Sequence, residues 1–199
     1  MILINCKRIR WRFLEIRKID WDKIKTRLDA LLVIDEYLTD PTEDWLRLVI
    51  KTEKDYGLRY LIDNGSGDSL DVILTDKMIL IKGFDHESSL SQFAADEWNQ
   101  DLIDSFYKGL DEKYVSLYSE DQKDETTFFI WYDGHAHQQT YQDQDGGEWL
   151  LSYLFDSFER FHEFVTDYYE ITVDKDLLRK LYMDGQLSDI EVKQLIQES

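Results

Sequence analysis

The stretch "LRYLIDNGSGDSLDVILTDKMILIKGF", residues 58–84, decides the fold of this chain. It contains three apolar segments, which are separated by the polar stretches 64–68 and 76–77. Glycine tolerates positive φ, and Asn and Asp side chains bond to nearby backbone, so both stretches favour tight reversals between strands. We therefore predict a three-stranded antiparallel meander over residues 58–84.

The segment before this meander predicts one helix. In residues 1–57, a basic stretch is followed by apolar residues at positions 24, 28, 31 and 32, which is helical spacing. We expect this helix to start near Asp20 and to end before Pro41. Residues 45–51 fit a strand and a helix equally well.

The segments after the meander predict more helices and one further strand pair. In chain order, we expect a helix over 102–110, a hairpin over 126–141 that turns at Asp133-Gly134, a long helix over 149–169, and two short helices that begin at Asp174 and Ser188. Glu191 lies three residues after Ser188 and completes a capping box. The expected fold class is α+β: an antiparallel sheet, made of meander plus hairpin, with flanking helices and a C-terminal helical hairpin.

Length and composition favour one domain. A chain of 199 residues with 43% hydrophobic content can bury a core of ordinary size, so we expect a single domain over 1–199. Its parts would be 1–57 (basic segment and helix), 58–141 (sheet region) and 148–199 (C-terminal helices). One cysteine, Cys6, excludes an intramolecular disulfide and a cysteine-based zinc site. No apolar run approaches the length of a membrane span, so we expect a cytoplasmic protein.

The charge is strongly negative and unevenly distributed. The net charge is −19; residues 1–27 hold nine Lys/Arg and three Asp/Glu, whereas residues 28–199 hold 14 Lys/Arg and 39 Asp/Glu. Such a surface repels nucleic acid and anionic membranes and attracts cationic partners. Two interpretations stay open: the charge keeps the protein soluble, or it serves to bind a basic protein.

The triplet Asp85-His86-Glu87 follows the meander and has two interpretations. As a polar turn where the chain leaves the sheet, it would have a structural role. As a catalytic site, His86 with Asp85 or Glu87 would serve a metal-dependent or carboxylate-dependent hydrolase. Strand alternation would place Asp85 and Glu87 on one side and His86 on the other, so the three need not converge.

The sequence contains few other residues whose pattern indicates catalysis or metal binding. His135 and His137 would share one face of a strand, which is acceptable spacing for two metal ligands. A phosphate-binding loop, a nucleophile elbow and an H-E-x-x-H motif are all missing. We predict no bound metal and no cofactor, and an enzyme is the less favoured alternative.

The acidic, glycine-bearing loop before position 150 is the favoured contact surface for a partner. Its candidate binding residues are Tyr141, Asp143, Asp145, Glu148 and Trp149. Carboxylates there would attract a basic protein, and the two aromatic residues could anchor it.

Two resemblances add to this picture. "YLIDNGSGDSLDVIL", "GFDHESSLS", "TTFFIW" and "DYYEITVDKDLLRKLY" occur in this order, and residues 58–199 thereby resemble a family of uncharacterised bacterial proteins, which brings no established activity. More distantly, Gly65, Gly67, Asp68 and His86, with the helix that begins at Ser157-Phe158, resemble the SMI1/KNR4-like immunity proteins. That resemblance implies binding and neutralising a toxin, often a nuclease.

These observations predict an acidic cytosolic protein-binding module. Its most specific version is an immunity-type inhibitor that masks a cationic toxin, and the alternative is the hydrolase that uses His86. The oligomeric state is left open.

Overall fold

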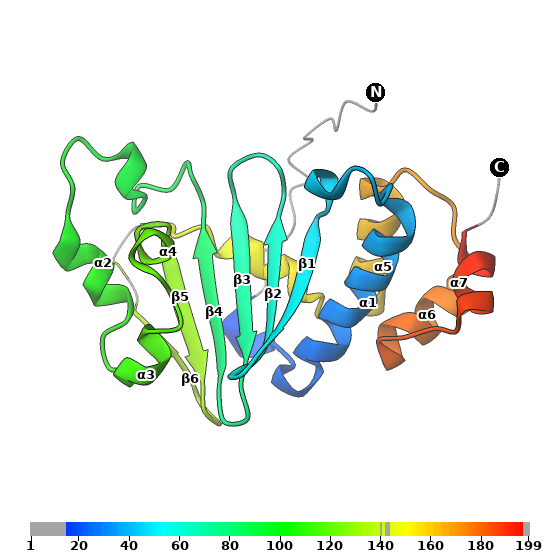
Figure 1. The fold of residues 1–199 in the computed structure, drawn as a ribbon, viewed down its shortest axis with the longest axis horizontal. Coiled ribbons are helices and arrows are strands. Elements are labelled where there is room, and N and C mark those ends of the chain that lie inside the picture. Colours follow the sequence, from blue (N-terminus) through cyan, green and yellow to red (C-terminus); the bar gives the residue numbers. More distant parts are fainter. Residues whose placement is uncertain (1–14, 140, 142–143, 197–199) are drawn as a thin grey trace.

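The computed structural model describes residues 15–139, 141 and 144–196. Six strands form one sheet in the order β1-β2-β3-β4-β5-β6, and each strand runs antiparallel to its neighbour (Figure 1). They are β1 (Val49–Lys54), β2 (Gly57–Asp63), β3 (Ser69–Leu74), β4 (Ile79–Phe84), β5 (Phe128–Tyr132) and β6 (Ala136–Gln138). The predicted meander and hairpin are thus confirmed, and the fold is α+β.

The helices lie in two groups beside this sheet. In Figure 1, α1, α5, α6 and α7 lie on the β1 side, whereas α2, α3 and α4 lie on the side of β5 and β6. The helices are α1 (Ile24–Leu38), α2 (Gln100–Phe106), α3 (Glu112–Val115), α4 (Glu120–Asp124), α5 (Phe158–Tyr168), α6 (Lys175–Asp184) and α7 (Asp189–Leu195). Short 3-10 helices are η1 (Ile16–Lys18), η2 (Trp21–Lys23), η3 (Asp44–Leu46), η4 (Gln92–Ala94) and η5 (Glu148–Leu154).

Each face of the sheet is covered by its own apolar core. Neighbouring residues of β3, Val72 and Ile73, belong to different cores, because side chains alternate between the two faces of a strand. The main core lies between one face and α1, η5, α5 and α6. The second core lies between the other face and the segment that joins β4 to β5, which contains α2, α3 and α4.

A buried carboxylate attaches α1 to the edge strand β1. Asp35 is only 1% exposed, and its oxygens accept hydrogen bonds from Arg47 Nε (2.9 Å) and from the backbone N–H groups of Leu48 (3.1 Å) and Val49 (3.2 Å). The Tyr169 hydroxyl donates to it as well, at 3.0 Å. This carboxylate therefore fulfils its hydrogen bonds within the fold, as a buried charge must.

A second set of buried charges lies under the second core. Asp71 forms an ion pair with Arg59, and the Lys82 amine donates to the Glu125 carbonyl. Burial lowers the pKa of Lys82 to about 8, although Asp71 and Glu125 act in the opposite direction. Asp71 and Lys82 are buried and Arg59 is partly buried, and their partners lie within the chain, so these charges have a structural role.

Of the other expected elements, one ambiguous segment is now assigned, one long helix is wrong and two helix starts are confirmed. Residues 45–51 contain both alternatives, because η3 ends before β1 begins. The long helix over 149–169 is wrong: Phe155 has φ +45°, which breaks the helix between η5 and α5, and the Ser157 hydroxyl then caps α5. Asp174 and Ser188 begin α6 and α7 as predicted, the latter with its capping box.

Two expectations concern membrane spans and the single cysteine. Within the part of the chain that the structure describes, no helix has both the length and the apolar character that a membrane span requires. Cys6 lies outside the described residues.

Candidate functional site

Three segments that are distant in sequence meet at one end of the sheet. They are the β2–β3 reversal (64–68), the exit from β4 (85–88) and the glycine-bearing segment that leads into η5 (144–149). Asp68 lies next to the exit from β4 because Ser69 pairs with Phe84 in the β3–β4 register. We call this meeting place the carboxylate–imidazole cluster, after Asp68, Asp85 and His86.

Asp68 connects the reversal to His86. Its Oδ1 accepts hydrogen bonds from the backbone N–H of His86 (3.1 Å) and from Nδ1 of the His86 ring (2.7 Å). Its Oδ2 accepts from Asn64 Nδ2 at 2.9 Å. The tight turn at 64–68 therefore positions a buried carboxylate against a ring that is itself 45% exposed.

Asp85 connects the exit from β4 to η5. Its Oδ2 accepts a hydrogen bond from Trp149 Nε1 (2.8 Å), and its Oδ1 accepts from the Glu87 N–H (2.9 Å). Gly147 lies directly over it: a Cβ atom at Gly147 would be 2.3 Å from Cβ of Asp85, and the residue has φ +87°. Only glycine fits this position, both for its backbone conformation and for the space.

The expected separation of the triplet by strand alternation is wrong. β4 ends at Phe84, and residues 85–88 form a turn that the Ser88 N–H closes on the Asp85 carbonyl (3.1 Å). In a turn the side chains no longer alternate, so Asp85 and His86 both approach Asp68. Glu87 lies further away, with Oε1 4.0 Å from Nε2 of His86.

The cluster contains atoms that could coordinate a metal ion, but they already form hydrogen bonds within the protein. Ligand atoms of Asp68, Asp85 and His86 lie within 4.8 Å of one another. Each of the four carboxylate oxygens, however, already accepts a hydrogen bond from the protein, and Nδ1 of His86 is directed at Asp68. This arrangement favours a structural role, with Nε2 of His86 as the ring nitrogen that remains for other contacts.

The segment before η5 is held from both sides. The Ser88 hydroxyl donates to the Asp145 carbonyl (2.7 Å), and the Thr127 hydroxyl donates to the Gly146 carbonyl (2.6 Å). Glu148 accepts from the Gly146 N–H (3.0 Å). Burial, together with the neighbouring Asp145, raises the pKa of Glu148. These carboxylates thus take part in the internal contacts of the segment.

The candidate binding residues of this loop lie in several environments. Trp149 is half-buried against the main core and donates to Asp85. Tyr141 packs against Phe106 of the second core, with ring centroids 5.2 Å apart, and its hydroxyl bonds to Ser105. Asp143 lies outside the described residues. That this loop contacts a partner stays a prediction.

Phe93 and Trp98 are functional candidates that the sequence did not reveal. Both lie on the loop between β4 and α2 and are strongly exposed, by 62% and 50%. They form a row with Phe84: the Phe84 and Phe93 rings are 5.8 Å apart, and the Phe93 and Trp98 rings 5.9 Å apart, each pair near a right angle. We call these three residues the aromatic row. Their spacing has no helical or strand period, so no sequence pattern pointed to them.

The segment that carries this row is also strongly acidic, and we call it the acidic layer. Residues 85–125 contain twelve Asp/Glu and three Lys, and they cover the second core. Two of the three lysines are paired within the segment, Lys113 with Asp111 and Lys123 with Glu120. Burial and the nearby Asp121 and Glu120 raise the pKa of Asp124. Negative charge is thus crowded on this face.

The two other histidine candidates lie outside the carboxylate–imidazole cluster. His137 stacks on Trp131, with ring centroids 5.1 Å apart, and its Nε2 lies 3.1 Å from Asp133 Oδ1. His135 is exposed in the turn before β6. Among the described residues, the only group of three ligand atoms within 4.8 Å is that of Asp68, Asp85 and His86, so neither of these histidines belongs to it.

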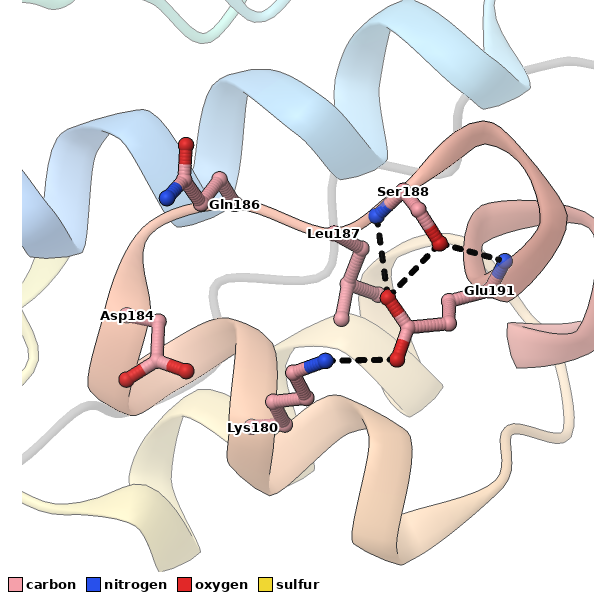
Figure 2. Close-up of a pocket in the computed structure, with 6 residues that line it drawn as sticks. All are labelled: Lys180, Asp184, Gln186, Leu187, Ser188 and Glu191. Carbon is pink, nitrogen blue, oxygen red and sulfur yellow. Dashed lines mark hydrogen bonds and ion pairs between the residues drawn. The ribbon is translucent and has the colours of Figure 1, made fainter.

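A shallow hollow of about 310 Å³ lies at the turn between α6 and α7. Figure 2 shows that Lys180, Ser188 and Glu191 bond to one another in it. Oε1 of Glu191 accepts from Lys180 (2.5 Å), while Oε2 accepts from the Ser188 N–H (3.0 Å) and hydroxyl (2.8 Å). The hollow is therefore a by-product of the capping box that starts α7.

Comparison with known proteins adds no relative: no family model, no curated protein and no solved structure matches this chain. The resemblances drawn from its motifs accordingly stay predictions.

Proposed function

We propose that this protein is an acidic binding module for a basic partner protein. The observation that carries the proposal is the acidic layer of residues 85–125, which contains twelve carboxylates and three lysines and includes the helices that pack on the second core. Carboxylates that are concentrated on one face attract a cationic partner and raise the association rate.

The distribution of cations supports the proposal. Residues 28–199 contain 14 Lys/Arg, and at least half of them already form ion pairs with carboxylates of the chain. These residues are Arg47, Lys51, Arg59, Lys113, Lys123, Arg160 and Lys180. The cations therefore neutralise local carboxylates, and the remaining acidic surface keeps its excess of negative charge.

The most specific version of the proposal is an immunity-type inhibitor in the bacterial cytoplasm whose partner is a cationic toxin. It rests on the resemblance to SMI1/KNR4-like proteins and on the sign of the charge. Masking a basic enzyme requires a stable acidic surface and no chemistry of its own.

A hydrolase that uses His86 with Asp85 or Glu87 is the second candidate. One observation favours it, the convergence of Asp68, Asp85 and His86. The two candidates predict opposite results for His86→Ala. A binding module keeps its partner when this ring is lost, whereas a hydrolase loses its activity.

The test uses binding kinetics with a partner recovered from the native cell, at low and at high salt. We expect the partner to be basic and its association rate constant to fall as salt screens the charges. Neutralising two exposed acids of the layer, with Asp104→Asn and Glu125→Gln, should lower that rate constant further.

The matched control removes the same charge elsewhere. Glu163 and Asp167 are exposed on α5, which packs on the main core at the other face of the sheet. Glu163→Gln with Asp167→Asn should slow association less than the change in the acidic layer. An acidic partner, or association that is indifferent to salt, would refute the proposal.

A further inference from the structure

We infer that Phe93 and Trp98 receive an arginine side chain of the basic partner, with Asp96 and Glu97 as its ion-pair partners. This inference rests on the proposed function and adds the contact site and the chemical group that it recognises. It concerns a different surface from the loop before η5, whose aromatic residues are used by the fold.

The exposure of the two rings is the first step. Exposed apolar side chains that lie together and are rimmed by polar residues mark interaction sites, whereas single ones do not. The Phe93 ring contacts both Phe84 and Trp98, in edge-to-face geometry. Since 62% of Phe93 is still exposed, a face of its ring remains open to solvent.

The charge beside the rings decides what they can bind. Asp96 and Glu97 lie between Phe93 and Trp98 in the sequence, and both are exposed. An apolar partner would have to desolvate these carboxylates without a counter-charge, which is costly. A guanidinium group avoids this cost, because it stacks on an aromatic face and also bonds to a carboxylate.

The chain uses the same type of contact internally. Five aromatic rings among the described residues have a cation of the chain over them, within 3.4 to 5.7 Å of the ring centroid. They are Tyr60, Tyr114, Tyr118, Phe158 and Tyr182. No such cation lies over Phe93 or Trp98 in the described part of the chain. These two rings are therefore available to a cation from another molecule.

The loop holds both rings in place before a partner arrives. Gln92 is buried, and its side-chain oxygen accepts from the Asn99 N–H at 2.6 Å, which ties together the two ends of the tip that carries the rings. Leu90 packs into the second core, and the Ser88 hydroxyl bonds to the Asp145 carbonyl. A pre-ordered loop loses less entropy on binding.

The experiment measures the binding of labelled synthetic peptides to the full chain by fluorescence anisotropy. The probe is an arginine–glycine repeat peptide, and the comparison peptides carry lysine–glycine and neutral serine–glycine repeats. We expect the arginine peptide to bind more tightly than the lysine peptide. Phe93→Ala with Trp98→Ala should weaken its binding about tenfold, as expected for the loss of cation–π contacts, with little change in the salt dependence.

Two control variants complete the test. Trp45 is 76% exposed but lies in η3, outside the acidic layer, so Trp45→Ala should leave binding of the arginine peptide unchanged. Asp96→Asn with Glu97→Gln should weaken binding and also flatten its salt dependence. Because all of these side chains are exposed, the variants should fold, and an unchanged thermal unfolding curve checks this.

The outcomes separate this inference from the proposed function. If the Phe93/Trp98 double variant binds the arginine peptide as well as the unchanged protein does, the inference fails while the acidic module stands. If lysine and arginine peptides bind equally, the assignment to guanidinium is overturned. If neither peptide binds more tightly than the neutral one, the proposed function fails as well.

Discussion

Two pairs of aromatic residues lie near the same end of the sheet and have opposite surroundings. Trp149 and Tyr141 use their polar atoms inside the molecule, in hydrogen bonds to Asp85 and Ser105. Phe93 and Trp98 are strongly exposed, and the acids Asp96 and Glu97 lie between them in the sequence. The sequence pattern favoured the first pair as anchors for a partner because acids flank it. The difference teaches that acids beside an aromatic residue indicate a contact surface only if the fold does not already use the ring.

The comparison predicts its largest effect for Trp149→Ala. This change removes packing against the main core and deprives Asp85 of a donor, so the free energy of unfolding should fall by about 3 kcal/mol. The exposed counterpart, Trp98→Ala, should change it by less than about 0.5 kcal/mol. Urea unfolding of the two variants measures both values. Equal losses would remove the distinction between the two pairs.

The sheet could be predicted from sequence because its signals are local. The reversal at 64–68 follows from glycine and Asx chemistry within a few residues, and the C-terminal helices from their own capping residues. The position of Asp68 beside His86 could also be predicted from the meander, because its register pairs Ser69 with Phe84. Continuing that register by one residue brings Asp68 to the exit from β4.

The candidate site could be predicted only in part, because its contacts are distant in sequence. Trp149 and Asp85 are 64 residues apart, and nothing near either residue indicates that they meet. The break of the long helix at Phe155 depends on a positive φ, which the sequence does not signal for a phenylalanine. Phe93 is exposed because its neighbours Leu90 and Gln92 are buried. Their burial results from tertiary packing, which the local sequence does not indicate.

The second prediction concerns the glycine that lies over Asp85. Gly147→Ala places a Cβ 2.3 Å from Cβ of Asp85 at φ +87°, so both the clash and the backbone strain should destabilise the fold, by about 2 kcal/mol together. Gly134 is the matched control, because it has φ +108° but no atom lies within 4 Å of the place that a Cβ would take. Gly134→Ala should cost only the backbone strain, about 1 kcal/mol.

This pair of variants tests only the region around Trp149 and the loop before η5. If Gly147→Ala is no more destabilising than Gly134→Ala, the segment over Asp85 moves aside easily. Trp149 would then also be available to a partner, and the loop before η5 would again be the favoured contact surface. Thermal unfolding of both variants, at the same pH and salt concentration, gives this comparison directly.

The smallest effect is expected for Glu148→Gln, and it depends on pH. Burial, followed by the hydrogen bond and charge of Asp145, raises the pKa of Glu148 above its ordinary value of 4.5, so the folded state binds the proton more tightly than the unfolded state does. Folding therefore takes up a proton between pH 4.5 and the raised pKa. The free energy of unfolding should rise as the pH is lowered from about 7 through this range, and the gain should be complete below the ordinary pKa.

Glu148→Gln removes the titrating group and with it this gain. Chemical unfolding at about pH 7 and about pH 5 measures the difference for both proteins, and Glu163→Gln, at an exposed position of α5, should keep the behaviour of the unchanged chain. The same variant also sharpens the comparison between the two regions. If Glu148 serves the fold, its replacement alters the pH dependence of stability and leaves the association rate with the partner as it was. If Glu148 instead contacts the partner, its replacement lowers the association rate and leaves the pH dependence of stability unchanged. The carboxylate would then be a charge on the binding surface and not part of the hydrogen bonds that hold the segment before η5.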